Sequence, residues 1–176
     1  MLSFDTILEK ARQRNREAFM RLYDLCSNAV FNASYRIVLN TQDAEEIAQD
    51  AILKVFSNIG GFKGTQRDFV ALVKTIAINK SIDMFRKRRK EPFFEDLEGA
   101  ATEVDENDSD LDDFPIERIK DALNGLSEGY RLTISMHLLD DMGFAEIAQL
   151  MGVKESTVRS QYVRGLQRLR GEINRP

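Results

Sequence analysis

Apolar residues recur at intervals of three and four along most of the 176-residue chain, which is the spacing that places them on one face of an α-helix. The first half predicts helices over residues 16–38, about 41–58 and about 66–90. Asn40 or Thr41 caps the second of these helices, and two adjacent glycines then end it. Strand patterns are almost absent, so the sequence predicts an all-α fold.

The third helix is apolar around most of its circumference, so we expect it to be the central helix of an N-terminal lobe. A capping-box sequence, Thr65 to Asp68, opens it, and the loop before it carries one aromatic residue, Phe62, that we expect to be exposed. The polar residues of the helix fall on one narrow stripe, formed by Asn79, Asp83, Arg86 and Lys90. This stripe is either a functional surface or only the solvent-facing side of the helix.

The second half predicts shorter helices over residues 116–126, 127–139, 144–151 and 156–170. Ser127 and Ser156 suit the caps of the second and the fourth. Gly152 suits a left-handed turn between the last two helices.

The last helix has two chemically different sides. Its apolar arc consists of Val158, Tyr162, Gly165, Leu166 and Leu169, and its opposite arc of Arg159, Ser160, Val163, Arg164, Gln167 and Arg170. A helix that docks an apolar stripe on a preceding short helix and presents arginine and serine has the chemistry of a major-groove reader. The alternative is an ordinary helical hairpin with a solvated basic face.

Charge is strongly segregated along the chain, although the formal net charge is only -4. Residues 1–90 carry 16 basic and 10 acidic side chains, residues 91–115 carry 11 acidic and no basic ones, and residues 116–176 carry 9 basic and 8 acidic ones. The middle segment is too polar and too acidic to fold by itself. We therefore expect two small helical domains, residues 1–90 and 116–176, joined by a flexible acidic linker over residues 91–115.

Composition excludes several other classes. No apolar run approaches the roughly eighteen residues of a membrane span, and the N-terminus lacks the pattern of a signal peptide, so we expect a cytoplasmic protein that does not insert into a membrane. The single cysteine, Cys26, excludes an intramolecular disulfide and a multi-cysteine zinc site, and it suits a helix core. His137 has no cysteine or acidic partner at ligand spacing. We expect no catalytic residue, no metal and no cofactor.

The motifs resemble a known family. The segments DAEEIAQDAILKVF (43–56) and DFVALVKTIAINKSIDMFRKRRK (68–90) are similar to region 2 of the extracytoplasmic-function (ECF) sigma factors, the minimal two-domain specificity subunits of bacterial RNA polymerase. The segments ALNGLSEGYRLTISMHLL (122–139) and GFAEIAQLMGVKESTVRSQYVRGLQRLR (143–170) are similar to region 4. Both motif sets stand in the family's order, and the linker has the family's length. The chain is therefore identified as a member of this family.

This resemblance implies a promoter-specific initiation factor rather than an enzyme, with core RNA polymerase, promoter DNA and an anti-sigma factor as partners. It implies a polymerase-docking helix face formed by Asp43, Glu45, Glu46, Gln49, Asp50, Leu53 and Phe56. Without the family, the same face would be a solvated acidic surface. The acidic linker would occupy polymerase channels that are built for nucleic acid, or it would serve only as a soluble spacer.

The resemblance also implies two sets of DNA contacts. Melted minus-10 DNA would be contacted by Phe62, Lys63, Thr65, Gln66, Arg67, Asn79, Lys80, Asp83 and Arg86. A base that has left the stack can be bound by a pocket that hydrogen-bonds its edge and stacks on its face. Duplex minus-35 DNA would be contacted by Lys154, Glu155, Ser156, Thr157, Arg159, Ser160, Arg164 and Arg168, with Arg168 on the backbone.

Some positions depart from the family pattern. Leu72 stands where the family usually has tryptophan, so we expect a core position filled by a smaller residue. Val163, Gly165 and Leu166 stand where histidine, alanine and a basic residue are common, which weakens the expectation of base contacts there.

Two other functions fit parts of the pattern. A helix-turn-helix repressor or activator would bind DNA alone and would need a dimerisation helix. A helical adaptor would bind only protein, and the arginines of the last helix would then be incidental.

Overall fold

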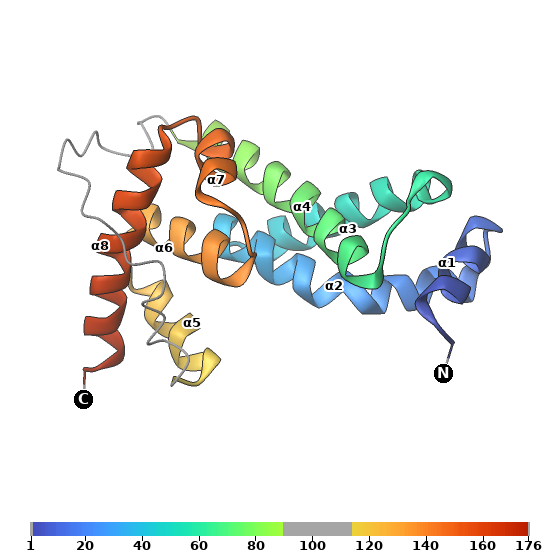
Figure 1. Ribbon diagram of the computed structural model, residues 1–176, viewed down its shortest axis with the longest axis horizontal. Coiled ribbons are helices and arrows are strands. Elements are labelled where there is room, and N and C mark those ends of the chain that lie inside the picture. The colour runs from blue at the N-terminus through green and yellow to red at the C-terminus, as the bar shows by residue number, and fades with distance from the viewer. Residues whose placement is uncertain (1, 90–113, 176) are drawn as a thin grey trace. The chain divides into compact units, whose positions relative to one another are not determined.

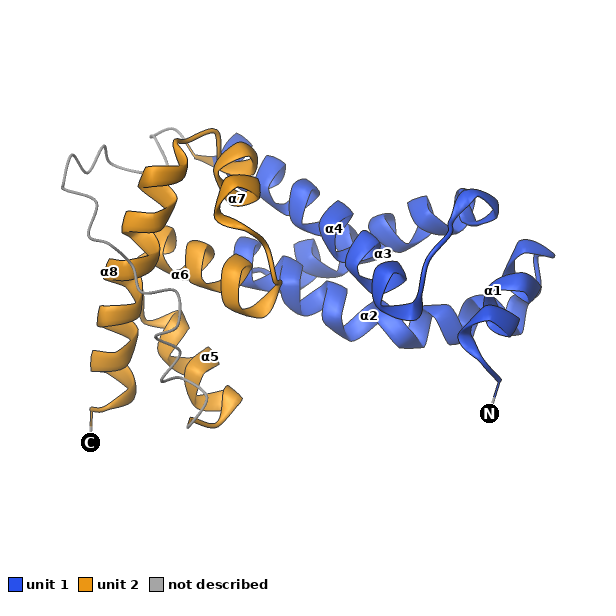
Figure 2. Cartoon of the chain, viewed as in Figure 1, with its two compact units in different colours: residues 1–88 blue, residues 89–176 orange. Residues whose placement is uncertain are grey.

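The computed structural model describes residues 2–89 and 114–175, and within these residues every regular element is helical. This confirms the prediction of an all-α fold. The chain divides into two compact units, residues 1–88 and 89–176, which are shown in different colours in Figure 2. The expected acidic linker lies outside the described residues except for its last two positions.

Unit 1 contains four α-helices and one short 3₁₀ turn (Figure 1). They are α1 (Phe4–Arg12), α2 (Arg16–Val38), α3 (Thr41–Ser57), the 3₁₀ turn (Ile59–Gly61) and α4 (Gln66–Arg88). Helix α2 packs against α1, α3 and α4, so α2 is the central helix of the unit. The prediction that α4 would be central is wrong, because α1 packs mainly against α2 and not against α4.

Residue Leu72 shows why α4 was misjudged. Its side chain is 40% exposed, so it does not fill a core position, and the expectation from the family's tryptophan is wrong. The buried side of α4 is formed by Phe69, Val73, Ala77, Ile78, Ser81 and Ile82. Periodicity could not separate these residues from Leu72, because apolar residues occur all round the helix.

Side chains cap the starts of two helices in unit 1, α3 and α4. The Asn40 side chain accepts a hydrogen bond from the Asp43 backbone N–H at 3.0 Å, which confirms Asn40 as the cap of α3. Thr65 and Asp68 form the predicted capping box at the start of α4. Helix α4 ends at Arg88, two residues before the predicted end.

The core of unit 1 runs along the buried face of α2. Leu22, Cys26 and Val30 are completely buried there and form one cluster with Phe69 and Val73 of α4. Burial raises the pKa of Cys26 to about 11, so its thiol stays protonated and unreactive near neutral pH. Cys26 is thus a core residue, as predicted.

Unit 2 contains α5 (Ile116–Asn124), α6 (Glu128–Ile134), a π-helical segment (Ser135–Leu139), α7 (Phe144–Met151) and α8 (Glu155–Ile173). Helix α8 packs against α5, α6 and α7 and therefore organises this unit. It extends three residues beyond the predicted end, because Ile173 continues the buried stripe.

The turn between α7 and α8 has the predicted conformation at Gly152, whose φ of 68° and ψ of 33° are left-handed. The residue that precedes α8 is Lys154, and Ser156 lies inside the first turn. The prediction that Ser156 caps α8 is therefore wrong. Among the described residues, no helix is both long enough and apolar enough to cross a membrane.

Candidate nucleic-acid interfaces

The loop before α4 is held by an aromatic cluster. The Phe62 ring packs edge-on against Phe69 at 5.5 Å and against Phe4 at 6.5 Å between centroids. Phe62 is consequently half-buried, and the expectation of an exposed aromatic residue is wrong. Lys63, in contrast, is exposed.

The capping box then fixes the chain at the start of α4. The Asp68 carboxylate accepts hydrogen bonds from the Thr65 backbone N–H at 2.8 Å and from its hydroxyl at 2.7 Å. These bonds, the backbone N–H first, lower the pKa of Asp68. Both Thr65 groups are already occupied, whereas Gln66 and Arg67 remain exposed.

Farther along α4, the structure places Asn79, Asp83 and Arg86 on the exposed side. The Asn79 amide donates a hydrogen bond to the Thr75 carbonyl at 2.8 Å, which engages one of its two N–H groups. Lys80 forms an ion pair with Asp50 of α3 at 3.0 Å. The fourth member of the predicted stripe, Lys90, lies outside the described residues.

The exposed face of α3 is acidic and partly apolar. Glu45, Glu46, Gln49, Asp50 and Leu53 are exposed, whereas Asp43 and Phe56 are half-buried. Asp43 receives two hydrogen bonds from the Arg88 guanidinium, at 2.5 and 3.1 Å, and these bonds lower the pKa of Asp43.

A groove of about 280 Å³ runs between α3 and α2. Ala48, Gln49 and Ile52 line it from α3, and Tyr23 and Phe31 line it from α2. The α3 face therefore continues onto aromatic residues of α2, which lie outside the predicted docking surface. The apolar spacing along residues 16–38 predicts a helix but does not indicate that Tyr23 and Phe31 lie beside α3.

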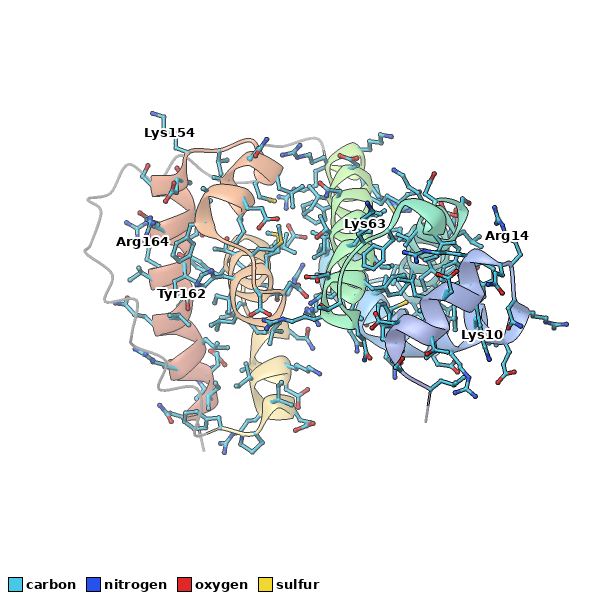
Figure 3. All side chains as sticks on the ribbon, turned by 45° about the vertical axis from the view of Figure 1, so that its right-hand side comes forward. Lys10, Arg14, Lys63, Lys154, Tyr162 and Arg164 are labelled. Atoms are coloured by element: carbon cyan, nitrogen blue, oxygen red, sulfur yellow. The ribbon has the colours of Figure 1, made fainter. Side chains whose placement is uncertain are left out.

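Helix α8 has the two sides that its sequence predicts. Val158, Tyr162, Gly165, Leu166 and Leu169 are buried, whereas Lys154, Glu155, Ser156 and Arg168 are exposed. Thr157, Arg159, Ser160 and Arg164 are half-buried. Figure 3 shows Tyr162 and Arg164 projecting from different sides of the helix.

An aromatic stack connects α8 with α7 and with the π-helical segment. His137 stacks on Phe144 at 4.2 Å and meets the Tyr162 ring edge-on at 4.7 Å. The Nδ1 atom of His137 lies 2.8 Å from the Met142 carbonyl oxygen. His137 is therefore a structural residue of this unit, and burial raises the pKa of its neighbour Tyr162.

Aromatic rings also contact two of the predicted minus-35 residues. The Arg159 guanidinium lies over the Phe144 ring at 4.8 Å, and it also pairs with Glu155 at 2.8 Å. Arg168 lies over the Tyr130 ring at 5.4 Å. Both arginines are thus oriented by aromatic rings that are distant from them in sequence, so the sequence alone does not indicate these contacts.

Within the described residues, no group of three or more histidine, cysteine, aspartate or glutamate side chains is arranged to hold a metal ion.

Comparisons with known proteins agree with both units. Residues 22–91 match the family described as Sigma-70 region 2, and residues 116–169 match Sigma-70, region 4. The ECF RNA polymerase sigma factor SigW of Bacillus subtilis is 25% identical over 94% of each chain. The chain belongs to the ECF sigma factors.

Two further sigma factors are similar to this chain over most of its length. The ECF sigma factor BldN of Streptomyces coelicolor is 28% identical over 93% of this chain and 63% of its own length. The sigma factor RpoE of Bartonella quintana, solved in complex with the anti-sigma factor NepR, shares the fold with a TM-score of 0.54 and 23% identity, over 89% of this chain and 98% of that one.

As an ECF sigma factor, this protein directs promoter-specific initiation by RNA polymerase and is not an enzyme. Its region 2 match begins inside α2, so α1 precedes the matched segment. The region 4 match covers α5, α6, α7 and most of α8.

Proposed function

We propose that the two units of this sigma factor contact separate promoter elements while they are bound to core RNA polymerase. The observation that carries this proposal is the geometry of α8, which buries one side and presents arginine and serine on the other, directly after the left-handed turn at Gly152. Arginine forms bidentate hydrogen bonds with guanine or phosphate, so this side suits duplex DNA.

In unit 2, minus-35 contacts are assigned to the eight residues predicted from the sequence, Lys154, Glu155, Ser156, Thr157, Arg159, Ser160, Arg164 and Arg168. The aromatic supports under Arg159 and Arg168 favour this assignment, because they limit the directions in which each guanidinium can point.

In unit 1, minus-10 contacts are assigned to the loop and the exposed side of α4. Lys63, Gln66, Arg67 and Asn79 are accessible there. Phe62 and Thr65 serve this surface mainly by shaping the loop, since their groups are engaged internally. Lys80 reaches DNA only if its ion pair with Asp50 opens.

The polymerase-docking surface is assigned to the exposed α3 face together with the groove beside α2. Glu45, Glu46 and Gln49 supply polar contacts, and Leu53, which is 61% exposed, supplies an apolar one. Such a mixed surface suits a protein partner.

The remaining assignments follow the family. We place domain boundaries at residues 1–90 and 116–176 with a connecting linker over 91–115, and we place the protein in the cytoplasm, where the polymerase acts. An anti-sigma factor is the proposed inhibitor, by analogy with the Bartonella sigma factor that was solved with NepR.

The test is transcription in vitro with the purified protein, core polymerase and promoter fragments. Specific initiation that needs both proteins supports the proposal, whereas DNA binding that is indifferent to polymerase supports the repressor alternative.

A double variant, Arg159→Ala with Arg164→Ala, separates the sigma factor from an adaptor. We expect promoter-specific initiation to fall at least tenfold, because each well-placed arginine contributes about 1–3 kcal/mol of discrimination. Polymerase affinity, measured in parallel, should be unchanged. Full initiation by the double variant would favour the adaptor.

A further inference from the structure

Helix α1 contacts the loop that precedes α4 through one arginine. The Arg12 guanidinium donates a hydrogen bond to the backbone carbonyl of Phe62 at 2.8 Å, across 50 positions of sequence. Its other terminal nitrogen pairs with Glu9 at 3.1 Å within α1. The Arg12 side chain is 34% exposed, so water weakens this contact without removing it.

The same helix also holds the Phe62 side chain. Phe4 lies against both Phe62 and Phe69, at 6.5 and 5.9 Å between ring centroids. Ile7, Leu8 and Ala11 anchor α1 in the core of unit 1. Phe62 is therefore fixed through its carbonyl and through its ring by a single anchored helix.

Only two residues separate Phe62 from the next fixed point, the capping box at Thr65. One of them, Gly64, has a φ of 153°, a conformation that side-chain-bearing residues rarely adopt. A Cβ atom at Gly64 would lie 2.9 Å from the Asp68 Cβ and 3.2 Å from the Phe62 ring. The path of the backbone from residue 62 to residue 65 is thus closely defined, and it presents Lys63 to solvent.

We propose that α1 is a positioning element for promoter melting, with Arg12 as the positioning residue that holds this loop in its DNA-binding conformation. This inference rests on the proposed function of the loop in minus-10 contacts. A loop that is already ordered loses less conformational entropy when it captures a base, so binding is tighter. Helix α1 lies before the segment that matches region 2, so this role is additional to the matched region.

The first test measures loop order in the free, full-length protein. Arg12→Met keeps the aliphatic part of the side chain and removes the donor. We expect amide hydrogen exchange at Phe62 and Thr65 to become about tenfold faster. Unchanged exchange at both amides would overturn the proposal.

The second test measures open-complex lifetime on polymerase. Arg12→Met should shorten this lifetime about fivefold, and Arg12→Lys, which can still donate one bond, should recover part of it. Polymerase affinity should not change. Glu9→Gln removes the ion pair but keeps the bond to Phe62, and Arg21→Gln removes a comparable pair with Glu17 on α2, so both serve as matched controls with full activity.

A promoter with abasic minus-10 positions on the melted strand distinguishes a loss of loop positioning from a general weakening of the open complex. If Arg12 acts through base capture, Arg12→Met and the original protein should have equal lifetimes on this DNA. An equal fivefold loss on both promoters would contradict the positioning role.

The loop variant Lys63→Ala separates this inference from the proposed function. If Lys63→Ala shortens the lifetime and Arg12→Met does not, the positioning role fails while the loop's function stands. If neither variant changes the open-complex lifetime, although amide hydrogen exchange is faster in Arg12→Met, the proposed contact between the loop and DNA is contradicted.

Discussion

The two units hold their candidate DNA-contacting elements by different means. In unit 1, polar bonds add to the aromatic cluster around Phe62: Arg12 binds the Phe62 carbonyl, Asp68 completes the capping box with Thr65 at the start of α4, and Arg88 of α4 binds Asp43 of α3. In unit 2, α8 is held by close apolar packing and by an aromatic stack. In the described part of unit 2, no capping side chain hydrogen-bonds to the start of α6, α7 or α8.

This difference has a thermodynamic consequence. Adding volume to a closely packed interface lowers the stability strongly, because neighbouring atoms cannot move apart without losing contacts. Exposed polar bonds contribute less each, and they depend on protonation and salt. Unit 2 should therefore be sensitive to added volume, and unit 1 to deleted polar groups and to acid.

The largest stability effect is expected at Gly165. A Cβ atom there would lie 2.8 Å from Ile134 Cδ1 and 3.2 Å from Tyr130 Cβ, so α8 approaches α6 closely because this residue is glycine. Gly165→Val should destabilise unit 2 by about 2 kcal/mol through overpacking. Hydrogen exchange of amides in α6 and α8 as a function of denaturant measures the change.

Gly171 is the matched control in the same helix, because a Cβ built there has no described atom within 4 Å apart from its chain neighbours and the adjacent backbone of α8. Gly171→Val should change stability by less than about 0.5 kcal/mol. Equal losses at the two positions would show that helix propensity, and not packing, sets the stability of α8.

A smaller effect is expected from the capping box of unit 1. Thr65→Ala removes the hydroxyl that bonds to Asp68 and should cost about 1 kcal/mol, with the loss confined to unit 1. Thr75→Ala, the same substitution in the exposed middle of α4, should be neutral or slightly stabilising. Denaturant unfolding, followed at amides of α4, measures the stability of both variants. An equal loss of stability in Thr65→Ala and Thr75→Ala would count against the cap.

The smallest effect is expected from the Asp43–Arg88 pair, and it depends on pH. The bond from Arg88 lowers the pKa of Asp43 in the folded chain. The contribution to stability is therefore present above the ordinary carboxyl pKa of about 4 and is lost as the pH falls through the lowered value.

Arg88→Gln should raise the pKa of Asp43 toward its ordinary value and remove this acid-sensitive contribution. A carboxyl-carbon NMR titration measures the pKa directly. Lys87→Gln, at the residue directly before Arg88, should leave the Asp43 titration unchanged. A similar shift in both variants would point to general loss of positive charge instead of the specific bond.

The sequence predicted most of the helices because apolar spacing and caps are local signals. Residues 16–38 coincide with α2, and Asn40, Gly152 and the Thr65–Asp68 box behave as their residue types predict. Helix α1 was missed although it carries the same local signals, since Ser3 caps it and Ile7, Leu8 and Ala11 form its buried stripe.

The candidate site was less predictable, because its supports come from residues distant in sequence. The contact of Arg12 with Phe62, and that of Arg159 with Phe144, depend on the tertiary fold. Leu72 and Phe62 were misjudged for the same reason. The family's tryptophan predicted burial for Leu72, but this position lies on the exposed side of α4. A polar loop predicted exposure for Phe62, but Phe4 of α1 and Phe69 of α4 pack against its ring.

The central claim, that the two units contact separate promoter elements only on the polymerase, can be tested by site-directed DNA cleavage. A cleaving chelate is attached at Lys63→Cys or at Ser160→Cys. Cys26 should stay unmodified, because it is completely buried and its pKa is raised to about 11. We predict cuts near minus-10 from position 63 and near minus-35 from position 160, both dependent on core polymerase. Cuts at one common site, or equally strong cuts without polymerase, would contradict the account.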